Sequence, residues 1–330
     1  MHNEYMKVIY FAKEAWEEAY IKEKLPGAEV VFYLGPIAQY PDARDADAEV
    51  LSVFVNSPVG AVEMDRFPKL RLIATRSTGT DHIDALEAQK RGIAVASVPG
   101  YGAPTVAEFA FALLLSLSRK VCDAHKQVTE TGSFSQSGMT GFDLAGKTIG
   151  VVGCGKIGQH TARIAKGFGM KVLVCDAHRD EKLAGEIGFA YAELPELLGA
   201  SDVISLHVPY IKETHHLINM QNISQIKKGA YLINTARGAV VETAAIVKAL
   251  EDKILAGAGL DVLEEEGDMQ DEMHLLSGAH PREEELKVVL ENHYLIDHPR
   301  VIITPHIAFD TREAIERILD TTVENIKALQ

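Results

Sequence analysis

Several charged or ionisable side chains come directly after short apolar runs in the second half of the chain. Asp176, His207, Arg237, Asp261 and His306 each stand at or just after the end of such a run. In a doubly wound parallel sheet, ligands bind outside the carboxyl ends of the strands. One polar residue after a strand is commonly only a loop residue. Five at one edge, three of them suited to holding ions or protons, indicate a site.

A glycine-rich loop lies near the middle of the chain. Gly153, Gly155 and Gly158 have the G-x-G-x-x-G spacing that lets a strand turn tightly into a helix and lets a pyrophosphate approach the backbone. The motif alone is weak evidence, because glycine-rich turns are common. The next apolar run ends in Asp176, about 20 residues further on, where a carboxylate would bind the ribose hydroxyls of NAD. Asp176 would repel a 2′-phosphate, although nearby Arg179 leaves NADP as an alternative.

Two of these residues suit the reduction of a carbonyl group. If a bound dinucleotide delivers hydride to a carbonyl carbon, the developing alkoxide needs a proton and the substrate needs an anchor. His306, which follows Pro305, is the candidate proton donor, and Arg237 can clamp a carboxylate bidentately. Together they predict a 2-keto acid as substrate.

Both assignments have structural alternatives. Arg237 could instead cap a helix or form an inter-domain ion pair. A carboxylate partner for His306 could come from the glutamates at 264–266, of which Glu266 is plausible, but these could equally be a solvated charge run. The residues alone leave the choice among the three glutamates open.

Composition argues against some partners and locations. The 330 residues, 47% of them hydrophobic, can bury a large core and suggest about two domains. A net charge of −14 disfavours nucleic acid or an anionic membrane as partner. Cys122, Cys154 and Cys175 lack metal-ligand or disulfide-framework spacing, so we expect reduced thiols and no metal. No signal-peptide pattern is present, and we expect a cytoplasmic protein.

Apolar runs alternate with helical patterns along the whole chain, which is typical of parallel sheets with crossover helices. A long helix is expected from about Thr105 to Val121, bridging two α/β units. The polar segment 264–300 is expected to be a surface insertion, helical from about Arg282 to Leu290, with solvated histidines. The predicted strands are the runs at residues 8–12, 29–34, 49–55, 70–75, 93–98, 172–175, 203–206, 230–234, 256–260 and 301–304, besides the run before the glycine loop.

Five ordered motifs together resemble the D-isomer-specific 2-hydroxyacid dehydrogenase family. They are the glycine loop, then Asp-Val-Ile-Ser-Leu-His-Val-Pro at 202–209, Asn-Thr-Ala-Arg-Gly at 234–238, Gly-Leu-Asp-Val at 259–262 and Thr-Pro-His at 304–306. The resemblance implies a Rossmann NAD-binding domain at 103–304 and a discontinuous flavodoxin-like substrate domain at 1–102 and 305–330. It also selects Glu266, because the family's catalytic glutamate lies five positions beyond the aspartate of the Gly-Leu-Asp-Val motif.

The resemblance assigns roles residue by residue. The catalytic residues are Arg237, Glu266 and His306. The loop at 76–84 matches the family's carboxylate-binding loop, so the substrate-binding residues are Thr78, Gly79, Arg237 and His306, with Tyr101 and Phe54 lining the pocket. Phe54 could instead be a core aromatic. The NAD-binding residues are Gly153, Gly155, Lys156, Ile157, Gly158, Asp176, His207, Val208, Pro209, Thr235, Ala236, Arg237, Asp261 and His306.

Within the family, the segments around Tyr101, His207 and Phe309 most resemble D-lactate dehydrogenases. The expected reaction interconverts pyruvate, or a similar 2-keto acid, and the D-2-hydroxy acid with NAD. Reduction of glyoxylate or hydroxypyruvate is the close alternative, and an NAD-sensing corepressor-like scaffold is the alternative from another class. The resemblance also implies a homodimer, with its contacts in the helix from Thr105 and the segment to about Phe142.

Overall fold

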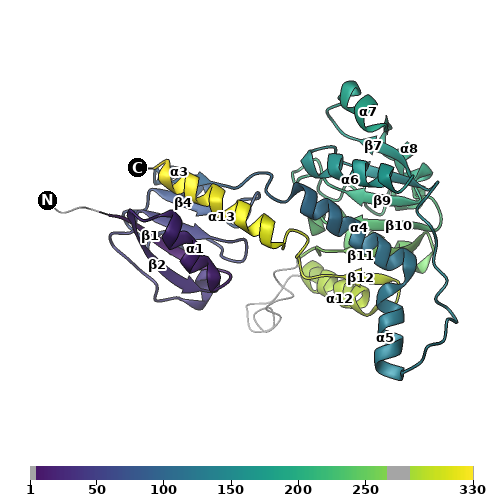
Figure 1. The fold of residues 1–330 in the computed structure, drawn as a ribbon, viewed down its shortest axis with the longest axis horizontal. Helices are drawn as coiled ribbons and strands as arrows, with labels where there is room; N and C mark the ends of the chain where they lie inside the picture. Colours follow the sequence, from purple (N-terminus) through teal and green to yellow (C-terminus); the bar gives the residue numbers. More distant parts are fainter. Residues whose placement is uncertain (1–4, 266–282, 330) are drawn as a thin grey trace. The chain divides into compact units, whose positions relative to one another are not determined.

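The computed structural model describes residues 5–265 and 283–329, and the chain divides into two compact units (Figure 1). The first unit combines Met1–Tyr101 with Thr311–Gln330, and the second spans Gly102–Asp310. Each unit is built on its own parallel β-sheet. Within the described ranges, no helix is both long and apolar enough to cross a membrane.

The first unit has a five-stranded parallel sheet in the order β2-β1-β3-β4-β5. This is the strand order of flavodoxin-like folds. Its strands lie within or close to the predicted apolar runs: β1 Met6–Ala12, β2 Ala28–Leu34, β3 Val50–Val53, β4 Leu72–Thr75 and β5 Ala94–Ala96.

Both faces of this sheet are covered, because successive residues of a strand point to opposite faces. Ile9 and Phe11 of β1 belong to one core cluster, and Val8 and Tyr10 belong to the other. The C-terminal helix α13 (Arg312–Lys327) adds Leu319, Val323 and Ile326 to the second cluster, so the end of the chain completes the first unit. The other helices are α1 Trp16–Lys24, the 3₁₀ turn η1 Ile37–Gln39, α2 Ala61–Met64 and α3 Ala85–Lys90.

The second unit has a seven-stranded parallel sheet in the order β12-β11-β10-β9-β6-β7-β8. Six of these strands have the Rossmann order, with β12 added at one edge. The edge strand β8 was not predicted, because two residues are too short to form an apolar pattern. The strands are β6 Thr148–Val152, β7 Lys171–Cys175, β8 Ala190–Tyr191, β9 Val203–Leu206, β10 Ala230–Asn234, β11 Leu255–Leu260 and β12 Val301–Ile303.

Helices bury both faces of this sheet as well. α4 (Ala103–Arg119) and α6 (Lys156–Gly167) pack their apolar residues into one core cluster. α8 (Leu194–Ala200) and α9 (Thr243–Glu251) pack into the other. The remaining elements are α5 Val121–Thr131, α7 Glu181–Ile187, η2 Ile223–Gln225, η3 Gly238–Val240 and α12 Glu283–Asp297.

Two predicted helices differ from the structure. The helix expected from Thr105 to Val121 ends at Arg119, because Lys120 takes a left-handed backbone with φ 53°, and α5 begins directly after it. The segment expected to be a surface insertion contributes α12, which runs to Asp297 and buries Leu295 completely in the core. α12 is therefore the crossover helix between β11 and β12. His274 and His280 lie outside the described residues.

Candidate active site

The three glycines of the loop after β6 have three different surroundings. Gly153 has φ +92°, which favours glycine, and a Cβ there would lie 2.7 Å from the carbonyl oxygen of His207. A Cβ on Gly158 would lie 2.0 Å from the carbonyl oxygen of Gly153, so only glycine lets α6 pack this closely. A Cβ on Gly155 would meet nothing within 4 Å. A pyrophosphate-binding loop requires a tight turn, close packing of the following helix and unoccupied space next to the middle glycine.

Asp176 follows β7 and accepts hydrogen bonds from two backbone N–H groups. One carboxylate oxygen accepts from the N–H of Cys154 at 2.5 Å, and the other accepts from the N–H of His178 at 2.7 Å. The carboxylate therefore lies against the glycine loop. Each oxygen has two lone pairs, so capacity to accept from ribose hydroxyls remains. Arg179 is the residue that kept NADP as an alternative cofactor. It forms an ion pair with Glu193, in which Nη2 and Oε1 are 2.5 Å apart.

Cys154 lies inside the glycine loop and is buried. Burial, together with the charge of Asp176, raises the pKa of the Cys154 thiol to about 11. The thiol therefore stays protonated at physiological pH and acts as a small apolar group. Within the described part of the chain, no group of three His, Cys, Asp or Glu side chains could hold a metal ion.

Two buried polar atoms at the carboxyl edge of the second sheet have no hydrogen-bond partner among the described residues. They are Nδ1 of His207, after β9, and Oγ1 of Thr235, after β10. These strands are paired neighbours, so both atoms lie at adjacent strand ends. Buried polar groups in native proteins almost always have partners, and an orphaned pair beside a phosphate-binding loop is what a dinucleotide site would leave. The residues present fit the cofactor.

Two hydroxyl groups contact the same nitrogen of the His207 imidazole. Its Nε2 lies 3.0 Å from Oγ1 of Thr161, on α6, and 2.8 Å from Oγ of Ser205. Burial lowers the pKa of His207 to about 3, so the ring is neutral at physiological pH. His207 therefore links the end of β9 to the helix that follows the glycine loop. Sequence reasoning did not find this link, because nothing in the spacing pairs residue 207 with residue 161.

Arg237 follows β10 in an extended conformation and is half-buried. Its Nη1 donates to the carbonyl of its neighbour Ala236 at 2.7 Å, and within residues 5–265 and 283–329 it forms no ion pair. Asn234 fixes this turn by accepting from Ala236 N–H and by donating to the Arg237 carbonyl, both at 3.0 Å. A Cβ on Gly238 would lie 2.0 Å from the Leu263 backbone, so the arginine turn packs directly against the segment after β11.

Asp261 holds the loop that carries His306. Its carboxylate accepts from the Thr304 hydroxyl at 2.6 Å, from Ile307 N–H at 3.0 Å and from Ala308 N–H at 2.8 Å. His306 has φ 52°, a left-handed conformation that costs a non-glycine residue about 1–2 kcal/mol. Its N–H donates to the carbonyl of Asp261 at 2.9 Å. The bonds from Asp261 therefore hold His306 in a strained backbone, a common arrangement at functional sites. The predicted contact of Asp261 with NAD stays a prediction.

The structure separates the first two glutamates of the run 264–266. Glu264 is buried: one carboxylate oxygen lies 2.5 Å from Nε2 of His216, and the other accepts from the hydroxyl and N–H of Thr243 at 2.9 and 3.2 Å. The Glu264 carbonyl accepts from Asn292 of α12 at 2.7 Å. Glu265 is exposed and has φ 53°. Glu266 lies outside the described residues.

The predicted substrate residues of the first unit also follow its strands. Phe54 comes directly after β3, and Thr78 and Gly79 lie in the loop after β4. β3 and β4 are paired, so these residues share the carboxyl edge of the five-stranded sheet. Phe54 is half-buried and belongs to neither core cluster of the first unit. Tyr101 is half-buried, and its carbonyl accepts from Nε of Arg317 at 2.7 Å.

Comparison with known proteins decides the family. Residues 111–308 match the model of the D-isomer specific 2-hydroxyacid dehydrogenase family, NAD-binding domain. The chain is 39% identical over 290 residues to the glyoxylate reductase of Korarchaeum cryptofilum, covering 87% of this chain and 81% of that protein. It is 32% identical over 340 residues to the D-lactate dehydrogenase of Escherichia coli, covering 98% and 97%.

A solved structure agrees with these sequence matches. The D-lactate dehydrogenase of Aquifex aeolicus, complexed with NAD and lactic acid, has a TM-score of 0.84 and 38% identity, covering 98% of this chain and 95% of that one. The chain belongs to the D-isomer-specific 2-hydroxyacid dehydrogenase family. Membership confirms the predicted fold class, two parallel-sheet α/β domains with a Rossmann NAD-binding domain, and confirms NAD as the cofactor. The protein is an NAD-dependent 2-hydroxyacid dehydrogenase.

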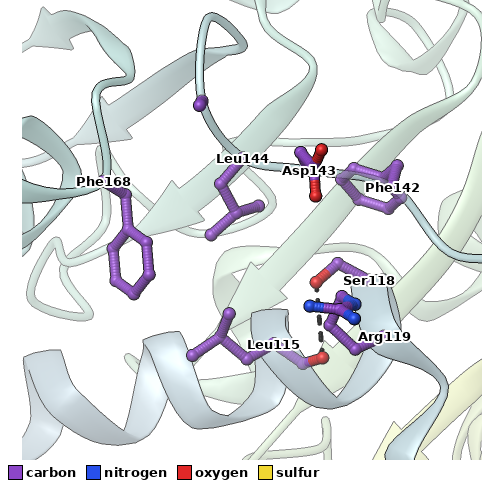
Figure 2. A pocket seen from close by; sticks show the side chains of 8 residues that line it. Leu115, Ser118, Arg119, Phe142, Asp143, Leu144 and Phe168 are labelled. Carbon is purple, nitrogen blue, oxygen red and sulfur yellow. Dashed lines mark hydrogen bonds between the residues drawn. The ribbon is translucent and has the colours of Figure 1, made fainter.

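A small pocket of the second unit lies away from the glycine loop and the carboxyl ends of the strands. It has a volume of about 220 Å³, and Figure 2 shows that α4 lines one side and the segment before β6 lines another. Its walls lie near the amino ends of the strands, because Phe142–Ala145 precede β6 and Phe168 precedes β7. The pocket therefore opens at the edge of the sheet opposite the glycine loop. It is lined by Leu115, Ser118, Arg119, Phe142, Asp143, Leu144, Ala145 and Phe168.

Proposed function

We propose that the protein reduces pyruvate, or a similarly short 2-keto acid, to the D-2-hydroxy acid, and catalyses the reverse oxidation. The observation that carries this proposal is Arg237, a half-buried guanidinium without an ion-pair partner in the described chain, on a turn packed beside the segment after β11. An unpaired arginine next to a hydride-transfer cofactor suits a substrate with a carboxylate beside its carbonyl. The second unit is the NAD-binding domain, and we assign the first unit to the substrate.

The reaction needs an anchor for the substrate and a proton for the alkoxide. When bound, NADH supplies the hydride. Arg237 holds the substrate carboxylate and, through its positive charge, polarises the adjacent carbonyl. We assign the N–H groups of Thr78 and Gly79, in the first unit, to binding of the substrate carboxylate as well. These contacts place the carbonyl carbon for attack and exclude rotated binding modes.

His306 supplies the proton. As an imidazolium it donates to the carbonyl oxygen during reduction and takes the proton back during oxidation. The backbone held by Asp261 fixes the direction of the ring. Glu266 supports the imidazolium by its charge. We assign Phe54 and Tyr101 of the first unit and the buried Phe309 of the second unit to contacts with the substrate side chain, and these apolar residues suit a short one.

Glyoxylate is the second candidate substrate, because three of the relatives that resemble the chain at 39–40% identity are glyoxylate reductases. The deciding experiment is a panel of pyruvate, glyoxylate and hydroxypyruvate with NADH and with NADPH. We expect the highest kcat/KM for pyruvate with NADH and formation of the D-isomer. Efficient turnover of hydroxypyruvate or glyoxylate with no turnover of pyruvate would reject the lactate assignment.

We further propose that the protein acts as a homodimer through α4, α5 and the segment to Phe142. α5 buries none of its residues, and apolar side chains remain exposed on and beside it: Val121 by 55%, Val128 by 36% and Phe134 by 87%. Val121 and Val128 lie on α5, and Phe134 follows it three residues after its end; exposed apolar side chains that lie close together are typical of interaction surfaces. Sedimentation equilibrium tests this, and a Phe134→Ser variant should weaken the dimer while a monomeric wild-type protein would refute it.

A further inference from the structure

The loop after β4 contains a chain of side-chain hydrogen bonds that ends on the backbone of Gly79. Nε2 of His82 lies 3.0 Å from Oγ1 of Thr75, which lies 2.7 Å from Oγ of Ser77. The Ser77 hydroxyl donates to the carbonyl of Gly79 at 2.6 Å. Thr75 and Ser77 are buried, so water does not compete for these bonds.

The donors in this chain can be assigned from one end. Ser77 has one hydroxyl proton, and the Gly79 carbonyl can only accept it. The Ser77 oxygen must then accept from Thr75, which uses the single proton of Thr75. The Thr75 oxygen in turn accepts from the imidazole, so Nε2 of His82 carries a proton. The direction runs from His82 through both hydroxyls to Gly79.

The chain orients peptide groups around the residues assigned to the substrate carboxylate. The carbonyl of Ser77 accepts from Val98 N–H at 2.8 Å, and the hydroxyl of Thr78 donates to the Val98 carbonyl at 3.0 Å. In a trans peptide the N–H points opposite to the preceding carbonyl, so the Thr78 N–H faces away from Val98. The Ser77 hydroxyl donates to the carbonyl of Gly79, which belongs to the Gly79–Thr80 peptide group. The N–H groups of Thr78 and Gly79 therefore lie on the short stretch of backbone between the bonds to Val98 and this bond. In the described chain, the N–H groups of Thr78 and Gly79 donate to no acceptor.

We infer that His82 is a positioning residue for substrate binding: its Nε2–H, relayed by the hydroxyls of Thr75 and Ser77, holds the Thr78–Gly79 amides ready for the carboxylate of the keto acid. The inference rests on the proposed function, which assigns those amides to the substrate. A separate anchor fixes the loop's beginning, where the Arg76 N–H donates to the Val53 carbonyl at 2.9 Å. The His82 relay therefore acts on the part of the loop beyond Arg76.

Steady-state kinetics of four variants test the role in substrate binding. Thr75→Val and His82→Leu break the relay, whereas Thr75→Ser and His82→Gln keep a hydroxyl and an N–H donor at the same positions. We expect each broken relay to raise KM for pyruvate roughly 3- to 10-fold, the loss of about one net hydrogen bond. KM for NADH should not change, and kcat should change little, because the carboxylate is held equally in the ground and transition states.

The double variant His82→Leu with Thr75→Val gives a second criterion. Because either change breaks the same relay, we expect KM to rise no further than in the more affected single variant. The inference would be overturned if the increases in KM for pyruvate were additive in the double variant. It would also be overturned if His82→Gln raised this KM as much as His82→Leu, or if KM for NADH rose in parallel.

A measurement that does not depend on activity tests the relay itself. Two-bond ¹H–¹⁵N spectra of histidine-labelled protein at pH 8 report the tautomer of each imidazole, and the signal missing from His82→Gln assigns His82. We expect the Nε2–H tautomer, and an Nδ1–H tautomer would overturn the relay. The Nε2–H tautomer combined with an unchanged KM for every keto acid in Thr75→Val would instead overturn the assignment of this loop to the substrate carboxylate.

Discussion

Replacing Asp261 by asparagine tests whether this buried carboxylate holds His306 in its working position. Asparagine keeps the shape but has one acceptor oxygen. In its better orientation it still accepts from Thr304 and Ile307 but turns an NH₂ group toward the Ala308 N–H. One hydrogen bond to a charged acceptor is lost, worth about 1.5–3 kcal/mol. Removing a costly buried charge recovers part of this, so we expect a net destabilisation of about 1–2 kcal/mol at pH 7.

The pH dependence of this loss has a definite sign. Burial raises the pKa of Asp261 above its ordinary value, and the hydrogen bonds from Thr304, Ala308 and Ile307 only partly offset this. The folded protein therefore binds this proton more tightly than the unfolded chain. Wild type gains stability from this group as the pH falls from above the raised pKa toward the ordinary value of 3.8. The stability difference between wild type and Asp261→Asn should grow from pH 7 to pH 4.5.

Asp202→Asn is a matched control at the opposite edge of the same sheet. Asp202 accepts from the Thr148 N–H at 2.9 Å and pairs with Lys227 at 2.9 Å. Burial opposes ionisation, but these two bonds hold the pKa of Asp202 below its ordinary value. The stability that Asp202 contributes is therefore present above pH 3.8 and is lost as the pH falls through the lowered pKa.

Urea unfolding and kcat measured on both variants decide the question. We expect Asp261→Asn to lower kcat at least tenfold, because His306 can relax from its left-handed backbone once the loop is loosened. Asp202→Asn should lose comparable stability and leave kcat unchanged. If the two variants lower kcat equally, or if Asp261→Asn leaves it unchanged, the reasoning about the His306 loop is wrong.

Three further predictions concern the anchor and the cofactor. Arg237→Lys keeps the charge but loses the bidentate geometry, so kcat/KM for pyruvate should fall roughly 10- to 100-fold. Gly158→Ala places a Cβ 2.0 Å from the Gly153 carbonyl oxygen and should lower Tm. A Cβ at Gly155 meets nothing within 4 Å, so Gly155→Ala should leave Tm unchanged. It should instead weaken NADH binding, measured by fluorescence titration. Asp176→Ala should narrow the ratio of kcat/KM for NADH over NADPH, and an unchanged ratio would contradict the ribose assignment.

Strand positions could be predicted from the sequence because both sheets are buried on both faces. Such strands form continuous apolar runs, and the polar residues at their carboxyl ends stand out against them. This is why the places of Asp176, His207, Arg237 and His306 at one sheet edge were foreseeable. The break after Arg119 was not, because Lys120 in a left-handed conformation has no sequence signature comparable to glycine.

Side-chain contacts with distant backbone were the part that the sequence could not supply. Asp261 matched a cofactor motif, yet its carboxylate accepts from residues more than forty positions away. The relay from His82 could likewise not be predicted from the sequence. A hydroxyl and an imidazole group seven residues apart in a loop have no fixed geometry until the loop is folded. α12 was predicted to be part of a surface insertion because it contains many polar residues. In the structure one side of the helix is nevertheless buried, including Asn292 and Leu295.

The run of glutamates after β11 shows how contacts and family spacing can be combined. On composition, the three residues were equivalent partners for His306. The contacts of Glu264 remove it from the choice, because both of its carboxylate oxygens are already engaged by His216 and Thr243. Its carbonyl is also held by Asn292, so this glutamate ties the segment after β11 to α9 and α12. Glu264 is therefore engaged elsewhere, which agrees with the proposal, based on the family spacing, that Glu266 supports the imidazolium.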